Sequence, residues 1–281
     1  MQTNQSETIK TAVRRFWGTR PCGVTHSAAP AGSPEFFRET EAHRFRIHTD
    51  WDHPFLKEAV GFRKYTGNKV LEVGCGIGVD ALEWAKSGNS VVALDYNLPS
   101  CQLTRGRFED ASAQGVYING DAENLPFPDA SFDIVYSFGV LHHTPGTQGA
   151  IGEIHRCLKR GGIAIVMLYY KWSAMVWGEV MWGSGVRQGG FRKTGSMRQV
   201  LSRYTEWDSQ CAGNVNPLTK AYSKREIRKM FQEFRHVQID LHYLWPGHFG
   251  PLRRLLPFLP AAWKQRFPAL FGFNAVIEAT K

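Results

Sequence analysis

Residues 69–80 read KVLEVGCGIGVD, an apolar run that ends in an acid and continues into three glycines. Gly74, Gly76 and Gly78 allow positive φ angles and a close approach of the backbone to a ligand. A helix that follows such a turn presents unpaired N–H groups in its first turn. We therefore expect a strand, a tight turn and a helix that together hold a nucleotide-like ligand.

The spacing of these glycines separates two kinds of ligand. Dinucleotide-binding folds typically use G-x-G-x-x-G, whereas this turn reads G-x-G-x-G. Glu72 stands two residues before the first glycine, where a carboxylate attracts an ammonium group and repels a pyrophosphate. The pattern favours an aminoacyl nucleoside. A nicotinamide-dependent protein and a binding protein without turnover remain alternatives.

Two later strand ends carry acids that suit the same ligand. Asp95 ends the run SVVALD about 20 residues after the turn, where a carboxylate can accept from ribose hydroxyls. Tyr96 beside it can pack against adenine. Asp121 follows the third expected strand and can accept from the adenine amino group. One such acid is commonly a solvated strand end, but three at successive strand ends indicate a site.

From residue 68 onward, short β-branched runs alternate with longer amphipathic stretches, which is typical of a doubly wound α/β fold with a mostly parallel sheet. Seven strands are expected, at 69–73, 90–94, 116–120, 132–137, 162–168, 236–243 and 274–280. Helices are expected at 79–87, 150–157 and 223–232. Ser223 and Glu226 have the spacing of a capping box for the last helix.

Three segments fall outside this alternation. We expect residues 1–66 to form an N-terminal arm and a helical cap, and residues 67–281 to form the main domain. That domain would carry insertions at 170–222 and 244–273, both rich in aromatic and basic residues. Long connections in a compact domain are either functional or disordered, and this aromatic content favours ordered lids.

The formal charge of +9 is concentrated in the second half of the chain: residues 151–281 carry 20 Lys and Arg against 8 Asp and Glu. Such a surface suits nucleic acid, an anionic lipid or an acidic small molecule, but a solvated basic face is as common. The five cysteines include no C-x-x-C pair, so we expect reduced thiols and no metal site. No apolar run reaches the roughly 20 residues of a membrane span, so a cytoplasmic protein is expected, with peripheral membrane contact as an option.

Four stretches, LEVGCGIG, VVALDYN, GDAENLPFPDASFDIVYSFGVLHHTP and EIHRCLKRGG, resemble the motifs of class I S-adenosylmethionine-dependent methyltransferases. The resemblance is closest to the ubiquinone/menaquinone-type and small-molecule group. It implies S-adenosylmethionine as cofactor, S-adenosylhomocysteine as product, and a seventh strand antiparallel beside the fifth. The cofactor contacts it implies, together with those inferred above, are Arg44, Glu72, Gly74, Cys75, Gly76, Gly78, Asp95, Tyr96, Asp121, Ala122, Glu123 and Ser137.

The methyl group of a sulfonium is already electrophilic, so such an enzyme mainly aligns the reactants and excludes water. His142 and His143 follow the fourth strand and could act as a base or form a pocket wall. Tyr169, Tyr170 and Trp172 follow the fifth strand and are candidates for the acceptor pocket. Trp172, Trp177 and Trp182 have no clean helical spacing, and we expect them chiefly to pack the core of a lid.

The expected function is methyl transfer to the oxygen, nitrogen or carbon of a small molecule, with anionic and lipid-like acceptors both open. The main alternative is a nucleic-acid methyltransferase that uses the basic second half for phosphate contacts. Against it, the segment SFGVLH has neither a D/N-P-P-aromatic motif nor a Pro-Cys nucleophile. The oligomeric state is not indicated.

Overall fold

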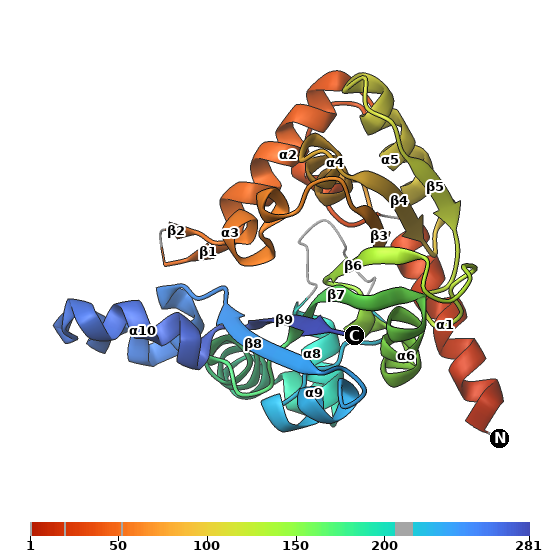
Figure 1. The fold of residues 1–281 in the computed structure, drawn as a ribbon. Coiled ribbons are helices and arrows are strands. Elements are labelled where there is room, and N and C mark those ends of the chain that lie inside the picture. The colour runs from red at the N-terminus through yellow and green to blue at the C-terminus, as the bar shows by residue number, and fades with distance from the viewer. Residues whose placement is uncertain (1, 20, 52, 206–215) are drawn as a thin grey trace.

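The computed structural model describes residues 2–19, 21–51, 53–205 and 216–281. Its centre is a seven-stranded sheet with helices on both faces, as Figure 1 shows, which confirms the doubly wound α/β fold. The strand order is β5-β4-β3-β6-β7-β9-β8. The strands are β3 (Lys69–Val73), β4 (Ser90–Asp95), β5 (Val116–Asn119), β6 (Phe132–Phe138), β7 (Leu158–Tyr169), β8 (His236–His242) and β9 (Asn274–Thr280). β9 runs antiparallel to both β7 and β8, as the family resemblance implied.

All seven expected strands are present, and the bounds of β3 and β9 match the prediction. The largest difference is at β7, which begins at Leu158 and not at Gly162. Leu158 pairs with Phe132, and the register then shifts before Ile163 pairs with Ile134. Gly161 takes a positive φ of 79° inside this irregularity. The glycine pair therefore bends the strand and does not begin it.

Side chains alternate along each strand, so each strand contributes to a buried core on both faces of the sheet. Leu71 belongs to the core under α6 (Thr147–Cys157) and α9 (Lys224–Met230). Val70 belongs to the opposite core, under α4 (Val79–Lys86), α5 (Leu98–Asp110) and α3 (Leu56–Val60). The Ser223–Glu226 capping box at the start of α9 is confirmed.

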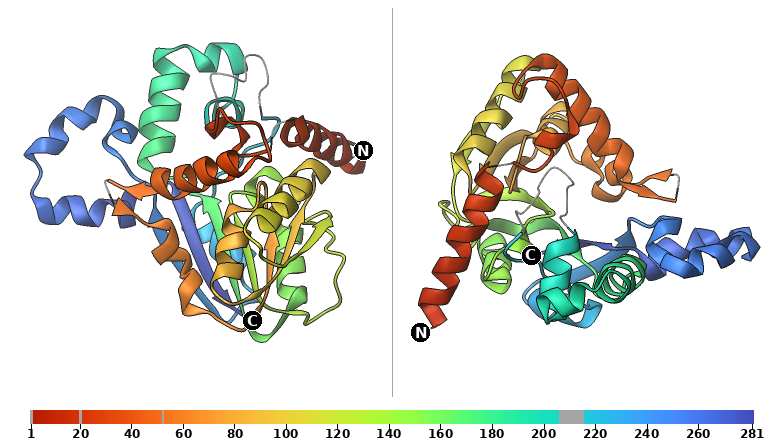
Figure 2. Two further views of the ribbon diagram at one scale, coloured as in Figure 1. Left: turned by 90° about the horizontal axis from the view of Figure 1, so that it is seen from above. Right: turned by 180° about the vertical axis from the view of Figure 1, so that it is seen from behind.

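The residues before β3 are more helical than expected. The segment expected as an arm begins with an 18-residue helix, α1 (Gln2–Thr19). After it come η1 (Val24–His26), α2 (Pro34–Ile47), the short hairpin of β1 (Thr49–Asp50) and β2 (His53–Pro54), then α3 and η2 (Phe62–Lys64). The two views in Figure 2 show α1 lying beside the sheet domain, next to α5.

Both insertions contain helices. The first insertion contains η4 (Met175–Arg187), α7 (Gly190–Thr194) and α8 (Met197–Thr205). Its residues 206–215, which include Cys211, lie outside the described residues. The second contains η5 (Pro246–Phe258) and α10 (Ala261–Phe271). A short helix, η3 (Leu141–His143), follows β6 earlier in the chain.

The expectation that three tryptophans pack the core of a lid was wrong. η4 is a wide π-helix, and its buried residues are Val176, Val180, Met181 and Gly185. Trp172, Trp177 and Trp182 are about half exposed. Trp177 and Trp182 lie on the exposed side of this helix, and Trp172, which precedes the helix, stacks on Trp177.

One buried side chain fastens the N-terminal cap to the sheet domain. The Arg107 guanidinium on α5, 1% exposed, donates to the carbonyls of Ile77 (2.7 Å) and Phe37 (2.9 Å) and to the Thr40 hydroxyl (2.7 Å). Ile77 lies in the glycine turn, and Phe37 and Thr40 lie on α2. The position of the cap relative to the turn therefore depends on this group.

We expect Arg107→Met to lower the free energy of unfolding by about 3 kcal/mol, because it leaves buried acceptors without a donor. Chemical denaturation measures the change. Arg105→Met is the matched control, since Arg105 lies on the same helix, is largely exposed and pairs with the exposed Glu109. Equal losses in the two variants would contradict the role assigned to Arg107.

Candidate cofactor and acceptor site

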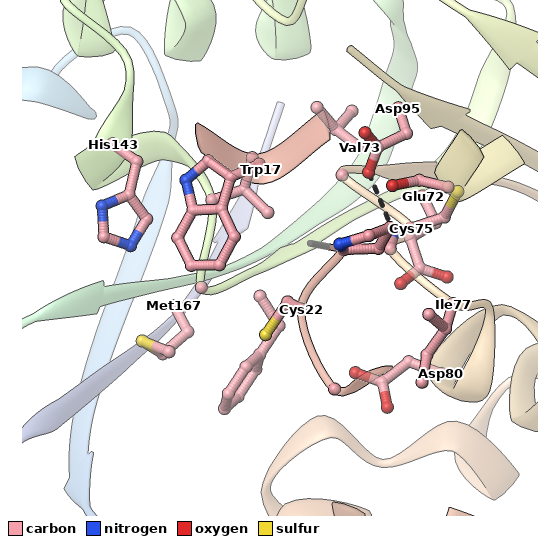
Figure 3. A pocket seen from close by; sticks show the side chains of 18 of the residues that line it. Trp17, Cys22, Glu72, Val73, Cys75, Ile77, Asp80, Asp95, His143 and Met167 are labelled. Carbon is pink, nitrogen blue, oxygen red and sulfur yellow. Dashed lines mark hydrogen bonds between the residues drawn. The ribbon is translucent and has the colours of Figure 1, made fainter. Parts of the chain in front are cut away.

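A cavity of about 430 Å³ lies at the carboxyl ends of β3, β4, β6 and β7. Open α/β sheets bind ligands at this edge. Figure 3 shows Glu72 and Asp95 toward one end of the cavity and His143 toward the other, with Trp17 and Cys22 between them. The cavity therefore joins the glycine turn to the region that follows β6.

The glycine turn lies against this cavity, and its backbone N–H groups fasten it to the end of β4. Gly74 has a φ of 82°, and a Cβ there would collide with the side chain of Val140. Gly78 has a φ of 75° and lies against Thr104, so a side chain is excluded there as well. The Gly76 N–H donates to Asp95 Oδ2 (2.9 Å), and the Asn97 N–H donates to Asp95 Oδ1 (2.9 Å). The ends of β3 and β4 are thereby locked together.

Glu72 offers an unsatisfied buried acceptor. Its side chain lines the cavity, and Oε2 has no hydrogen-bond partner among the described residues. Burial, followed by the charge of Asp80, raises the pKa of Glu72 well above its ordinary value. Burial also raises the pKa of Asp95, against the pull of its two backbone donors. A cationic group in the cavity would relieve this excess of buried carboxylates.

Arg44, predicted as a cofactor contact, does line the cavity, but its charge is paired with that of a carboxylate. Its guanidinium binds both oxygens of Asp80, with Nε–Oδ1 at 3.0 Å and Nη2–Oδ2 at 2.5 Å. Tyr136 donates to the same carboxylate (2.7 Å). Burial alone would raise the pKa of Asp80, but the charge of Arg44 and these hydrogen bonds outweigh it and lower that pKa.

Helix α1 covers the end of the cavity predicted to hold adenine. Lys10 pairs with Asp121 (2.7 Å) and Glu123 (2.9 Å), and Arg14 lies over the ring of Tyr96. Sequence reasoning missed these contacts. Lys10, Val13 and Trp17, which line the cavity, stand at i, i+3 and i+7 of the helix. That spacing is the pattern in the sequence that could have revealed a buried helical face.

The structure separates the two histidines. His142 is fully buried, lies outside the cavity lining, and has no partner for either ring nitrogen among the described residues. Burial, and then the charges of His143 and Lys220, lower its pKa well below the ordinary value. His143 does line the cavity, with its ring 5.5 Å from that of Trp17. Only His143 is placed to meet a ligand.

Of the other predicted residues, those that line the cavity are Gly74, Cys75, Gly76, Tyr96, Asp121, Ala122 and Tyr169. Those outside the lining are Gly78, Glu123, Ser137, Tyr170 and Trp172. The Ser137 hydroxyl is buried and donates to the Val73 carbonyl (2.9 Å), and Gly78 and Glu123 likewise support the turn and the loop near Thr144. Trp172 stacks on Trp177 at the surface.

The far end of the cavity is lined mainly by apolar and aromatic side chains that sequence reasoning did not name. They are Ile47, Phe138, Met167, Met175, Tyr243 and Phe273, with the polar groups His48 and Asn274 among them. Asn274 is the first residue of β9 and pairs with Tyr169 at the end of β7. The antiparallel direction of β9 therefore brings a residue from near the C-terminus to the cavity. In the described part of the chain, no group of three or more His, Cys, Asp and Glu is arranged to hold a metal ion.

Comparison with known proteins finds a similarity to methyltransferases over part of the chain. The model of a methyltransferase domain matches residues 71–166. The sterol 24-C-methyltransferase of Eremothecium gossypii is 40% identical over 112 residues, which are 38% of this chain and 29% of that protein. The cycloartenol-C-24-methyltransferase of Arabidopsis thaliana is 42% identical over 100 residues, 34% of this chain and 29% of that protein. The similarity thus spans less than a third of either relative.

A solved structure has a similar fold. The S-adenosylmethionine-dependent methyltransferase of Methanosarcina mazei superposes with a TM-score of 0.55 at 17% identity, covering 82% of this chain and 97% of the other. The similarity therefore extends beyond the matched domain to most of the sheet and its helices.

The orphaned carboxylate of Glu72 predicts a pH dependence of cofactor affinity. A carboxylate must be ionised to attract the ammonium of S-adenosylmethionine. Because the pKa of Glu72 is raised, protonation of this side chain competes with cofactor binding as the pH falls. The affinity for S-adenosylmethionine should therefore rise with pH, by at most about tenfold per pH unit. This holds below about pH 7, where the ammonium of the cofactor keeps its charge. Calorimetry across this range measures the slope.

In Glu72→Gln the slope should shrink and the affinity near pH 7 should fall at least about tenfold, because a charge-assisted hydrogen bond is lost. Glu83→Gln is the control: Glu83 is also buried, but it lies on α4 and pairs with Lys57. A slope unchanged in Glu72→Gln would refute the assignment of the ammonium to Glu72.

Proposed function

Because this chain carries a class I S-adenosylmethionine-dependent methyltransferase domain, we propose that it transfers the methyl group of that cofactor to a small, largely apolar acceptor. The observation that carries the proposal is a single cavity with an acidic, glycine-lined end and an aromatic end. The first end suits an aminoacyl nucleoside. The second suits an acceptor that is recognised mainly by shape and apolar contact.

The residues at the acidic end fit the cofactor group by group. Glu72 would receive the ammonium on its unpaired oxygen, and the backbone of Gly74 and Gly76 would run beside the methionyl part. Asp95 would accept from the ribose hydroxyls, and Tyr96 and Asp121 would flank the adenine. When bound, the cofactor supplies an electrophilic methyl group, so the protein needs no covalent nucleophile.

At the aromatic end, the chain's own residues orient the acceptor and keep water out. Phe138, Met167 and Phe273 present apolar surface, and Tyr169 stacks on Phe273 with ring centroids 4.1 Å apart. His48 contributes little charge, because burial and then the nearby Arg44 lower its pKa to about 3. A neutral lining favours an uncharged acceptor. The two relatives named for sterol and cycloartenol methylation agree with a lipid-like acceptor.

His143 is the residue that we propose accepts a proton from the acceptor. Its Nδ1 lies 2.9 Å from the Leu218 carbonyl, which can only accept, so Nδ1 carries the hydrogen. The Asn216 amide nitrogen, 3.1 Å from the same atom, would favour the other tautomer but is farther away. The lone pair is then on Nε2, the arrangement that a general base requires.

The cavity does not favour nucleic acid as the acceptor. Lys10 and Arg44 line it, and both are paired with carboxylates and so not free for phosphates. The aromatic end is formed by side chains from the end of α2, the sheet, the first insertion and the residues that flank the connection between β8 and β9. A flipped base would meet few polar partners there.

The proposed activity can be tested with S-adenosylmethionine labelled in its methyl group. The acceptors are a sterol with an unsaturated side chain, a prenylated phenol, a water-soluble amine and total RNA. We expect label only in the organic-extractable products of the first two. Label in RNA or in the amine, or cofactor binding without transfer to any of the four, would overturn the proposal.

With an active acceptor in hand, His143→Gln should lower kcat by about 10²-fold to 10⁴-fold and leave the Kd for S-adenosylmethionine within about twofold, since the side chain acts in proton transfer. His155→Gln on the outer side of α6 is the control and should match the wild type. An unchanged kcat in His143→Gln would mean that the histidine only forms the wall.

A further inference from the structure

The connection between β8 and β9 forms a separate projection, which we call the C-terminal lobe and define as residues 244–272. It consists of η5 and α10, and it extends beyond the end of the sheet in both Figure 1 and Figure 2. Gly250, with a φ of 55°, and Pro251 and Pro257 break η5 into short turns. The lobe is thus a compact projection and not one long helix.

An aromatic cluster holds the lobe to the rest of the protein. The Trp51 ring lies 6.3 Å from both Phe249 of η5 and Phe267 of α10, and its indole N–H donates to the Lys264 carbonyl (2.7 Å). Phe267 also meets Phe271 edge to face. On the other side, Gly250 packs against Gly178 and Trp182 of η4. The lobe therefore has its own apolar attachment.

A second set of apolar side chains in the lobe takes no part in this attachment. Phe258 is 84% exposed, and Trp263, Leu252 and Leu255 are each about 60% exposed. None of the four lines the cofactor cavity, so they do not cover the proposed acceptor. Large exposed apolar residues gathered in one lobe mark a surface that meets a partner.

Within the lobe, the Lys and Arg residues are not balanced by acids. Arg253 and Arg254 stand between Leu252 and Leu255, and Arg266 follows Trp263 by three residues. The lobe contains no Asp or Glu. Across the contact with η4, the carboxylate of Glu179 lies 3.8 Å from the buried His248 of the lobe. The surface mixes apolar and cationic groups without any compensating acid in the lobe.

From this juxtaposition we propose that the C-terminal lobe docks onto an anionic lipid bilayer. Leu252, Leu255, Phe258 and Trp263 enter the interfacial region, and Arg253 and Arg254 meet the lipid phosphates. Among the described residues no helix is long and apolar enough to cross a membrane, so the contact is peripheral. A second copy of this chain fits less well, because a symmetric contact would set the same acid-free basic surface against itself.

Vesicle co-sedimentation of the full chain tests the proposal without reference to methyl transfer. One set of vesicles is phosphatidylcholine alone, and in the other part of it is replaced by phosphatidylglycerol. We expect binding to the anionic set that weakens with salt. Leu255→Asp/Phe258→Asp should lower the affinity at least about a hundredfold, because both apolar insertions are lost.

Arg253→Gln/Arg254→Gln should lower the affinity for anionic vesicles about thirtyfold and change the binding to neutral vesicles little. The matched control is Arg225→Gln/Arg228→Gln, two exposed arginines on α9, and Leu98→Asp controls for a charge placed on another exposed apolar residue. Unchanged cofactor affinity shows that each variant is folded.

Three results would overturn the proposal: no binding to anionic vesicles, binding that is equal in lobe and control variants, or a concentration-dependent dimer that the lobe substitutions abolish. The last would identify a second copy as the occupant. Because no acceptor is used, failure here leaves the proposed activity standing, and failure of the activity assay leaves the docking surface standing.

Discussion

Three buried carboxylates, those of Glu72, Asp80 and Asp95, interact at the ends of β3 and β4, and the structure depends on how their charge is balanced. Arg44 neutralises Asp80 through two contacts, and backbone N–H groups stabilise Asp95. Glu72 is left with an unpaired oxygen. Burying a carboxylate oxygen without a hydrogen-bond partner costs free energy. We therefore attribute the unpaired oxygen of Glu72 to ligand binding. The site is electrostatically prepared for a cation, and S-adenosylmethionine, the proposed cofactor, carries an ammonium and a sulfonium.

The pairing of these buried charges also fixes the position of the N-terminal cap. Arg44 reaches Asp80 from α2, and Arg107 reaches α2 from α5, so two guanidinium groups tie the cap to the turn from opposite directions. Burial lowers the pKa of Arg107 to about 10, which still leaves it charged at neutral pH. Lys10 adds a third link at the far end through Asp121. The cap is therefore held by ion pairs and hydrogen bonds at the cavity wall, which couples its position to whatever occupies the cavity.

Most of the sheet and the acidic end of the site could be predicted from the sequence, because strand periodicity and the glycine turn are local patterns. The role of α1 could not, since its contacts join Lys10 to residues more than a hundred positions away. Asp80 resembles an ordinary first-turn acid until Arg44 and Tyr136 are seen around it. The aromatic end depends on several distant segments at once, so a motif in one segment reveals only part of it.

The topology also decides where the C-terminal lobe lies. β8 runs parallel to β7 because both are antiparallel to β9, so β8 ends, and β9 begins, at the same edge of the sheet as the cavity. The whole connection between them must therefore leave and re-enter at that edge, and Phe273, which directly follows the lobe, lines the aromatic end. A bilayer held by the lobe would consequently lie on the side of the molecule where the cavity is. Because β9 is antiparallel to its neighbours, the proposed membrane-docking lobe and the proposed acceptor site lie at the same edge of the sheet.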